Sequence, residues 1–467
     1  MNRREFIKHS AAAVAGTSVL LTACKNGKSQ ISTDTTQVPE GSMTLRVNPN
    51  TGDHVSLLGF GMMRLPVQAG GTARENPDSP IDQDAVNQMV DYALEHGVNY
   101  FDTSPAYCQG LSEQSTGIAL AKHKRSSYFI ATKLSNFSPD TWSANESKAM
   151  FERSLKYLQT DYIDYLLLHG IGMSGGGLDG MGAFYGRYMD NGILDWLVEQ
   201  KKKGRIRNLG FSYHGDVNVF DMLLRWHDEG KYHWDFVQIE LNYLDWKYAN
   251  EINPRNTDAD YLYAELHKRG IPAVIMEPLL GGRLAKQPDA ITRKMREMDY
   301  RYSPAAWAFR FAGNPEGVLT VLSGMTYLEH LKENVITYSP LYPLSADEEN
   351  WLLALAKDIY ELKAIPCTAC NYCMPCPYGL NIPGIFAHYN KCIAEGTMPA
   401  VGGQDNDFRR NRRAFLVGYD RAVPRLRQAD HCIGCYHCVS HCPQRIDIPK
   451  EMQRIDRFVD ALKMNNN

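Results

Sequence analysis

The feature that most constrains the fold is an alternation of short apolar runs with segments of helical periodicity. Eight runs have the length of a β-strand and are apolar on both faces, as is typical of parallel strands covered by helices. They are Val55–Gly61, Val98–Asp102, Tyr128–Lys133, Tyr162–His169, Arg205–Ser212, Phe236–Asn242, Pro272–Pro278 and Val318–Gly324. Between them apolar residues recur at helical spacing, as in Val86, Met89, Val90 and Ala93. The pattern predicts an α/β fold, a (β/α)8 TIM barrel over residues 43–345.

Four polar residues lie at the ends of three successive predicted strands. Asp102 ends the second strand, with Tyr107 in the following loop, while Lys133 ends the third and His169 the fourth. A carboxylate beside a buried strand is costly unless a charge compensates it. In a barrel of this kind the carboxyl ends of the strands form one rim, where function resides. An acid, a phenol, an ammonium and an imidazole at one rim therefore indicate an active site.

In this order the four residues resemble the catalytic tetrad of the aldo-keto reductases, and the resemblance covers residues 57–334. It implies an NAD(P)-dependent oxidoreductase that interconverts a small carbonyl and an alcohol by hydride transfer. Tyr107 would be the general acid/base, and Lys133, held by Asp102, would favour its ionised form. His169 would donate a hydrogen bond to the substrate oxygen. The glycine-rich segment 170–182 would be a wall of the substrate pocket or an insertion without a role.

The same resemblance implies contacts to the cofactor. Ser212 and Gln238 match positions that hydrogen-bond the nicotinamide carboxamide, and Asn334 matches one at the adenine. Met276 stands where many members place the aromatic ring that stacks on the nicotinamide, and Tyr213 stands where an Asn is usual.

A glycine-rich turn after the seventh predicted strand has two interpretations. Gly281 and Arg283 either wrap the pyrophosphate or form a tight turn with a surface arginine. Gly324 and His330 replace the basic pair with which many members grip the 2′-phosphate of NADP. The choice between NAD and NADP therefore stays open.

The cysteines are concentrated at the C-terminal end, where nine of the eleven follow residue 366. Eight of them form two runs at near-regular spacing: Cys367, Cys370, Cys373 and Cys376, then Cys432, Cys435, Cys438 and Cys442. Successive C-x2-C steps that end in Cys-Pro suit [4Fe–4S] clusters better than zinc or disulfides. Residues 346–467 are therefore predicted to form a small, mainly helical iron–sulfur domain.

This region resembles a two-cluster ferredoxin, which implies that the fourth cysteine of each run binds the other cluster. One cluster would use Cys367, Cys370, Cys373 and Cys442, and the other would use Cys432, Cys435, Cys438 and Cys376. The first run departs from the usual spacing at Cys376, and Cys392 fits neither run.

The N-terminus predicts export from the cytoplasm. Residues 1–24, with Arg3 and Arg4 before a short apolar run, resemble a twin-arginine signal that ends in a lipobox. Cys24 would carry a lipid anchor on the periplasmic or cell-surface side, and residues 25–42 would form a flexible tether. A net charge of −3 predicts no general attraction to nucleic acid.

Several functions remain possible from the sequence. In the first, the barrel is an enzyme and the clusters pass electrons to or from a redox protein. In the second, the barrel holds a nicotinamide without turnover, as a redox sensor or electron-transfer module. In the third, a reductase carries purely structural clusters. The arginines between residues 409 and 427 have three interpretations. They form a solvated face, they form a docking surface for an acidic redox partner, or they balance the negative charge of the clusters.

Overall fold

The computed structural model describes residues 41–73, 75–252, 256–361, 364–367, 369, 371, 373–400, 402–403, 406–439, 441–442, 444 and 446–464. The predicted export signal with Cys24, most of the predicted tether and the expected cluster ligand Cys370 lie outside these residues.

The central element is a closed barrel of eight parallel strands whose order follows the sequence, with the last strand pairing with the first. The strands are β3 (Leu58–Gly61), β4 (Tyr100–Asp102), β5 (Phe129–Leu134), β6 (Ile163–Ile171), β7 (Ile206–Tyr213), β8 (Phe236–Glu240), β9 (Ala273–Met276) and β10 (Val318–Ser323). The predicted (β/α)8 barrel is thus confirmed, because each apolar run can be buried on both faces only inside a ring of helices.

The first predicted strand is in fact two strands. Its beginning belongs to β2 (His54–Ser56), which pairs antiparallel with β1 (Leu45–Val47) in a hairpin outside the barrel sheet. The side chain of Asn48 in the hairpin donates a hydrogen bond to the Tyr165 hydroxyl (3.0 Å), and Val55 packs among the inward side chains of the barrel. The hairpin therefore closes the amino end of the barrel, opposite the rim expected to carry function.

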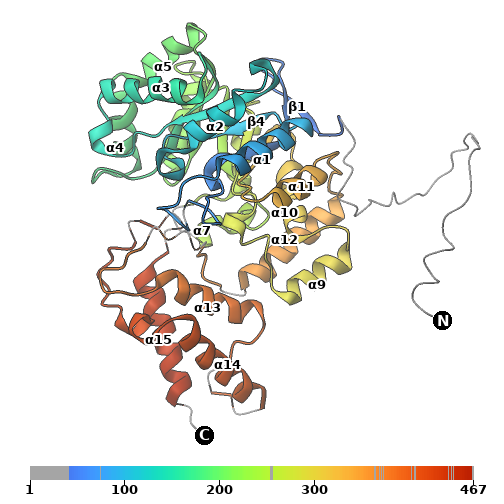
Figure 1. Ribbon diagram of the computed structural model, residues 1–467, viewed down its shortest axis with the longest axis vertical. Coiled ribbons are helices and arrows are strands. Elements are labelled where there is room, and N and C mark those ends of the chain that lie inside the picture. The colour runs from blue at the N-terminus through green and yellow to red at the C-terminus, as the bar shows by residue number, and fades with distance from the viewer. Residues whose placement is uncertain are drawn as a thin grey trace, which may run out of the picture. The chain divides into compact units, whose positions relative to one another are not determined.

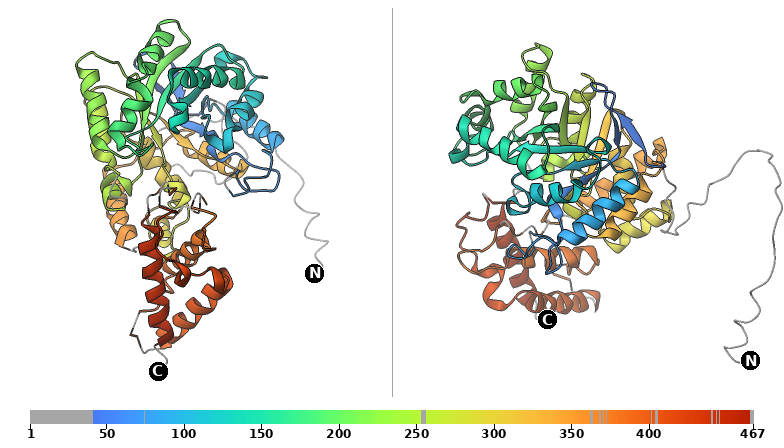
Figure 2. Two further views of the ribbon diagram at one scale, coloured as in Figure 1. Left: turned by 90° about the vertical axis from the view of Figure 1, so that its left-hand side faces the viewer. Right: turned by 45° about the horizontal axis from the view of Figure 1, so that its top comes forward.

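Helices cover the outside of the barrel (Figures 1 and 2). They are α1 (Gln83–Glu95), α2 (Ser112–Leu120), α3 (Ala144–Leu158), α4 (Gly180–Phe184), α5 (Ile193–Lys202), α6 (Val217–Asp228), α7 (Asp245–Ile252), α8 (Ala259–His267), α9 (Asp289–Met298), α10 (Pro304–Gly313) and α11 (Leu328–Thr337). Most turn an apolar stripe towards the sheet, as Val86, Met89 and Val90 of α1 do. Within the described residues, no helix is both long and apolar enough for a membrane span.

Helix α12 (Ala346–Glu361) belongs to the packing of the barrel. Leu352, Leu355 and Ile359 are buried in the same apolar core as the barrel helices. Near its start, Glu348 accepts a hydrogen bond from the buried Arg310 (3.1 Å). The predicted domain boundary between residues 345 and 346 assigns α12 to the C-terminal domain, although the helix packs in the core of the barrel.

The C-terminal region is helical, as predicted, and has a core of its own. It contains α13 (Ile382–Ala394), α14 (Asn406–Ala422) and α15 (Ile448–Met464), joined by long loops (Figure 1). Aromatic rings from the three helices pack together; the rings of Phe415 and Phe458, for example, are 5.2 Å apart in a T-shaped arrangement. The helices thus form a scaffold from which the cysteine-bearing loops extend.

Candidate active site

The rim at the carboxyl ends of the strands brings together three of the four predicted catalytic residues around one buried ammonium. Lys133 Nζ lies 2.5 Å from Asp102 Oδ1 and donates a second hydrogen bond to the carbonyl of Thr103 at 2.9 Å. The same Nζ atom lies 4.8 Å from the centre of the Tyr107 ring. Tyr107 itself begins the short turn η2 (Tyr107–Gly110). The pairing expected between Lys133 and Asp102 is therefore present, and it adjoins the phenol.

The Lys133–Asp102 pair is almost entirely removed from water, with 1% and 3% of the two side chains exposed. Burial raises the pKa of Asp102 and lowers that of Lys133, and the attraction between the two opposes both shifts. A buried ion pair adds little net stability, because desolvation offsets most of the attraction. Its position beside a phenol is more readily explained by chemistry than by stability.

His169 completes the group from strand β6. The rings of Tyr107 and His169 lie edge to face, with centres 5.8 Å apart. The hydroxyl of Ser135 lies 2.7 Å from Nδ1 of His169 and can donate a hydrogen bond to it, which would leave the ring proton on Nε2. Burial, followed by the positive charges of Lys133 and Arg187, holds the pKa of His169 well below its usual value. The imidazole is therefore neutral at physiological pH.

This low pKa predicts a pH dependence of stability. Below pH 6.5, the ordinary value for histidine, the unfolded chain binds a proton that the folded chain does not yet accept at His169. The free energy of unfolding should fall by up to about 1.4 kcal/mol per pH unit on this account. Denaturant titrations between pH 7.5 and 5 of the wild type and His169→Asn measure the effect. Since other histidines remain in both proteins, the variant should lose only the share of the slope due to His169; an identical slope in both proteins would contradict the prediction.

The two residues expected at the nicotinamide carboxamide are neighbours in the sheet. Ser212 on β7 pairs in register with Gln238 on β8, and both are buried. The hydroxyl of Ser212 accepts a hydrogen bond from the backbone N–H of Gly170 (2.9 Å). Among the described residues nothing hydrogen-bonds Oε1 of Gln238 or Oδ2 of Asp102. Buried acceptors of this kind are costly unless a ligand meets them, so this part of the rim fits a bound nicotinamide and its ribose.

The residues expected along the rest of the cofactor are more widely spread. Met276 is the last residue of β9, and Asn334, in α11, donates a hydrogen bond to Ser323 at the end of β10 (3.0 Å). Gly281, with φ of 66°, lies in the turn η6 (Leu280–Gly282). Its N–H donates to the carboxylate of Glu277 (2.5 Å) and is therefore engaged inside the protein.

Arg283 is half-buried and is not the surface group that the tight-turn interpretation expects. No partner for its Nη1 atom occurs among the residues that the structure describes, and the same is true of the buried hydroxyl of Tyr243. Burial lowers the pKa of Arg283, whereas nearby Asp245 raises it. Burial and the charge of Glu240 raise the pKa of Asp245 to about 8. An unsatisfied guanidinium and phenol at the rim suit the anionic part of a dinucleotide.

A family model described as "Aldo/keto reductase family" matches residues 57–350. The chain belongs to the aldo/keto reductase family. It is 28% identical over 323 residues to L-galactose dehydrogenase of Arabidopsis thaliana, which covers 65% of this chain and 91% of that protein. An uncharacterized oxidoreductase of Bacillus subtilis is 26% identical over 276 residues, 53% of this chain and 80% of that protein. The structure resembles the holo form of an aldo-keto reductase from Bacillus halodurans, with a TM-score of 0.51 and 25% identity over 67% of this chain and 96% of that one.

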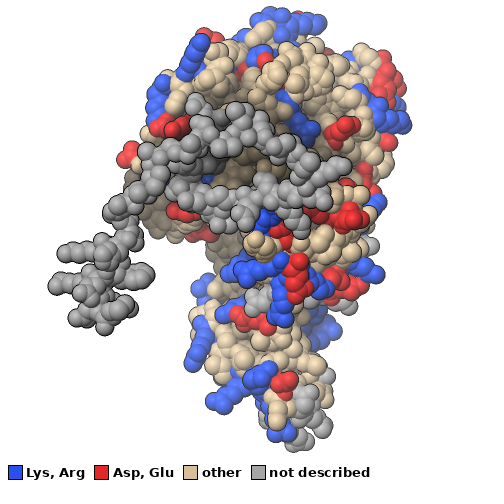
Figure 3. Space-filling model, turned by 90° about the vertical axis from the view of Figure 1, so that its right-hand side faces the viewer, with Lys and Arg blue, Asp and Glu red and all other residues tan. Residues whose placement is uncertain are grey.

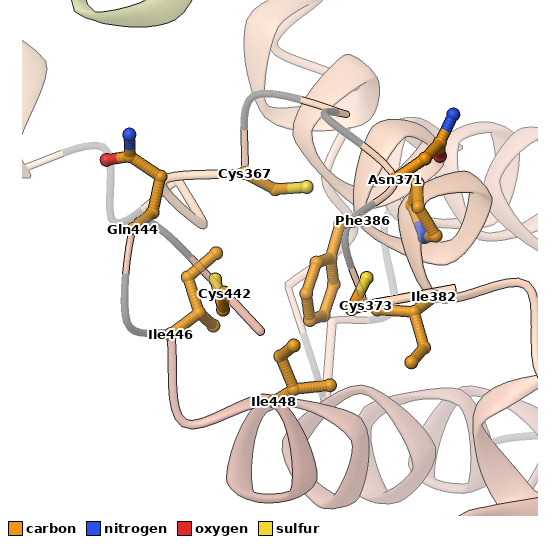
Figure 4. Close-up of a pocket in the computed structure, with 10 residues that line it drawn as sticks. Cys367, Asn371, Cys373, Ile382, Phe386, Cys442, Gln444, Ile446 and Ile448 are labelled. Atoms are coloured by element: carbon orange, nitrogen blue, oxygen red, sulfur yellow. The ribbon is translucent and has the colours of Figure 1, made fainter. Parts of the chain in front are cut away.

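This aldo/keto reductase also has a candidate metal region beyond the barrel. Cys367, Cys373 and Cys442 line one pocket together with apolar side chains such as Phe386 and Ile448 (Figure 4). Cys367 and Cys442 are far apart in the sequence, yet both face this pocket. The structure thus groups the last cysteine of the second run with members of the first.

Four other predicted ligands, all within the described residues, form a second group around Cys438. Burial and the neighbouring thiols of Cys432, Cys435 and Cys376 raise the pKa of Cys438 to about 11. Within the described part of the chain, no three His, Cys, Asp or Glu side chains converge tightly enough to hold a single metal ion. A family model described as "4Fe-4S dicluster domain" matches residues 366–447. The aldo/keto reductase is therefore an oxidoreductase with an iron–sulfur dicluster domain.

Sequence reasoning missed several residues of the barrel site. Arg187 contacts the backbone of His169, and Asp245 interacts with Arg283. Ser135 and Phe137 adjoin the His169 ring. Ser135 and Phe137 follow Lys133 so closely that their position after a strand end could have suggested them. Arg187 lies well beyond the fourth strand, and no local pattern marks it.

Proposed function

We propose that the barrel interconverts a carbonyl and an alcohol with bound NAD or NADP. The observation that carries this proposal is the buried Lys133–Asp102 pair beside Tyr107, next to the neutral ring of His169. A reduced nicotinamide supplies the hydride that adds to the carbonyl carbon. The residues of the chain supply everything else: a proton, a hydrogen bond to the oxygen and compensation of charge.

Tyr107 gives its phenolic proton to the substrate oxygen as negative charge develops there, and takes it back in alcohol oxidation. The ammonium of Lys133 lies close enough to stabilise the phenolate left behind. Asp102 holds that ammonium in place. The neutral imidazole of His169 can donate a hydrogen bond to the same oxygen without competing as an acid.

A loss of cofactor affinity tests the proposed nicotinamide site. Replacing Gln238 with leucine removes a buried hydrogen-bonding group, so the dissociation constant for the reduced nicotinamide should rise about five- to tenfold. Fluorescence titration with NADH and NADPH measures this and also decides between the two nucleotides. Gln114→Leu, an exposed position on α2, is the matched control. Absence of nicotinamide binding by the wild type would overturn the proposal. Binding without turnover of any carbonyl probe would favour a module that only holds the cofactor.

For the C-terminal domain we propose two [4Fe–4S] clusters with crossed ligands, which exchange single electrons with a redox protein. The two sets of neighbouring cysteines described above, one at the pocket of Cys367 and one around Cys438, support this arrangement. Cys435 is exposed, and Ile433 and Tyr436 beside it are 61% and 57% exposed, as suits a small docking patch. Arg425 and Arg427 are exposed nearby in sequence. On the face in Figure 3 basic and acidic side chains are interspersed.

The proposed cellular location rests on the N-terminal sequence alone. Twin-arginine export would carry the folded protein with its cofactors across the membrane, and a lipid on Cys24 would anchor it there. Mass spectrometry of the N-terminal peptide from the native membrane fraction tests both steps. A chain that begins at Met1 and carries no lipid would contradict them.

A further inference from the structure

Arg187 is a buried cation in the wall of the active site. It lies in the short turn η5 (Tyr185–Met189) and is 3% exposed. Its N–H groups donate to the carbonyls of His169 (2.5 Å) and Gly170 (3.3 Å), the side-chain oxygen of Asn136 (3.2 Å) and the hydroxyl of Tyr188 (2.8 Å). All of these acceptors are neutral. Within the described residues, no carboxylate forms an ion pair with Arg187.

The lack of a counterion is energetically unusual. A guanidinium stays protonated at any physiological pH, although burial lowers the pKa of Arg187. Removing a charge from water costs several kcal/mol, and hydrogen bonds to neutral dipoles offset only part of that cost. The other arginine that is equally buried among the described residues, Arg310, pairs with Glu348. The charge of Arg187 is therefore available to an anion from outside the chain.

A cavity next to Arg187 provides the place for such an anion. Its volume is about 150 Å³, and it is lined by Phe137, Met173, Ser174, Gly175, Ala183 and Arg187. Three of these residues come from the glycine-rich segment 170–182, for which the sequence allows either a wall of the substrate pocket or an insertion without a role. Apart from Arg187 and Ser174 the lining is apolar, so a single cationic side chain lines a small apolar cavity.

The cavity adjoins the catalytic imidazole through one aromatic ring. The centre of the Phe137 ring lies 4.7 Å from the His169 ring and 4.9 Å from the guanidinium carbon of Arg187. The Phe137 ring therefore separates the cavity from His169, and a ligand that contacts both Arg187 and His169 must pass beside this ring with a spacer at least as long as it. The apolar lining favours a hydrocarbon or aromatic spacer.

We propose that this cavity binds the carboxylate of the substrate, so that the enzyme acts on oxo acids in which a short apolar spacer separates carboxylate and carbonyl. The proposal rests on the proposed carbonyl chemistry. Four N–H groups of the guanidinium are engaged inside the protein, which leaves one N–H on Nη1, together with the positive charge, to contact a carboxylate oxygen. Recognition at Arg187 would orient the carbonyl oxygen towards His169 and Tyr107.

A matched pair of substrates tests the charge preference. The full chain, loaded with clusters and nicotinamide, is assayed with 4-carboxybenzaldehyde and with its methyl ester, which differ in charge but hardly in shape. The wild type should show about a tenfold or greater preference for the acid in kcat/KM, expressed mainly in KM. Arg187→Gln should remove this preference, lowering kcat/KM for the acid at least about tenfold more than for the ester, while any loss common to both substrates reports the contacts of Arg187 with the backbone of His169 and Gly170. Equal kcat/KM values for acid and ester in the wild type would overturn the proposal even if the variant does not fold.

A binding measurement separates this proposal from the carbonyl chemistry. Calorimetry with benzoate and with benzamide reports the anion site without any turnover. Benzoate should bind the wild type at least about tenfold more tightly than benzamide, and Arg187→Gln should lose that difference. Arg225→Gln replaces an exposed arginine on α6, removes the same charge and should leave the difference in affinity between benzoate and benzamide unchanged.

The outcomes separate the two proposals. If neither aldehyde is reduced but this binding pattern holds, the anion site stands and the reductase function fails. If benzoate and benzamide bind the wild type equally, the anion site is wrong.

Discussion

Replacing Tyr107 with phenylalanine should lower kcat for carbonyl reduction by about 10²–10⁴-fold, the usual contribution of a general acid. The ring remains and can keep its contacts with Lys133 and His169, so the loss isolates the phenolic proton. Without it, the proposed hydrogen bond from His169 and the charge of Lys133 still act near the substrate oxygen, but no proton is delivered to it. Stopped-flow oxidation of the bound reduced nicotinamide measures the step directly.

The matched control is Tyr157→Phe, a partly exposed tyrosine on α3 away from the rim. It should react at the wild-type rate. Nicotinamide affinity should be unchanged in Tyr107→Phe, because the phenol acts on the substrate. A Tyr107→Phe protein that reduces carbonyls at the wild-type rate would show that Tyr107 is not the acid.

Replacing Cys442 with serine should remove one of the two proposed clusters, so that iron and sulfide fall by about half. Cys442 lines the same pocket as Cys367 and Cys373, and this pocket also borders the apolar core of α13 and α15. Loss of the cluster would remove the covalent connection between the loop of Cys367 and Cys373 and the loop of Cys442, which are far apart in the sequence. The helical domain should then become sensitive to protease, while the barrel stays folded.

Cys376→Ser should remove the other proposed cluster, because this thiol lies near Cys438, as the thiols of Cys432 and Cys435 do. Electron paramagnetic resonance of the reduced proteins should therefore show complementary signals in the two variants. Cys392→Ser, which replaces a buried thiol on α13 outside both groups, should keep both signals. The same remaining signal in Cys442→Ser and Cys376→Ser would contradict crossed ligation.

Much of the barrel could be predicted because strands and helices leave local periodicities in the sequence. Each of the eight barrel strands overlaps a predicted run, although β5, β6 and β7 continue one or two residues beyond it. The polar residues at the strand ends are neighbours because parallel strands bring equivalent ends to one rim. The prediction failed where an apolar run does not reveal its partner. Val55 reads as part of a barrel strand, but it belongs to the hairpin that closes the barrel from below.

The same limit explains the residues that sequence reasoning missed at the site. Nothing near Arg187 in the sequence shows that its side chain reaches the carbonyl of His169. Likewise, Asp245 begins helix α7 after strand β8 and Arg283 follows strand β9, so the two interact only once the barrel has closed. Helix α12 follows the predicted barrel, yet its apolar stripe finds its partner in the barrel core.

The sequence alone determined the eightfold alternation, the order of acid, phenol, ammonium and imidazole, and the spacing of the cysteine runs, because each is written in the local order of residues. The tertiary structure alone decided which groups are buried and what they contact. It placed the ammonium of Lys133 beside the phenol of Tyr107, brought Cys442 to the pocket of Cys367, and left the charge of Arg187 facing a small apolar cavity. These contacts join residues far apart in the chain, and their energies depend on burial, which no local pattern records.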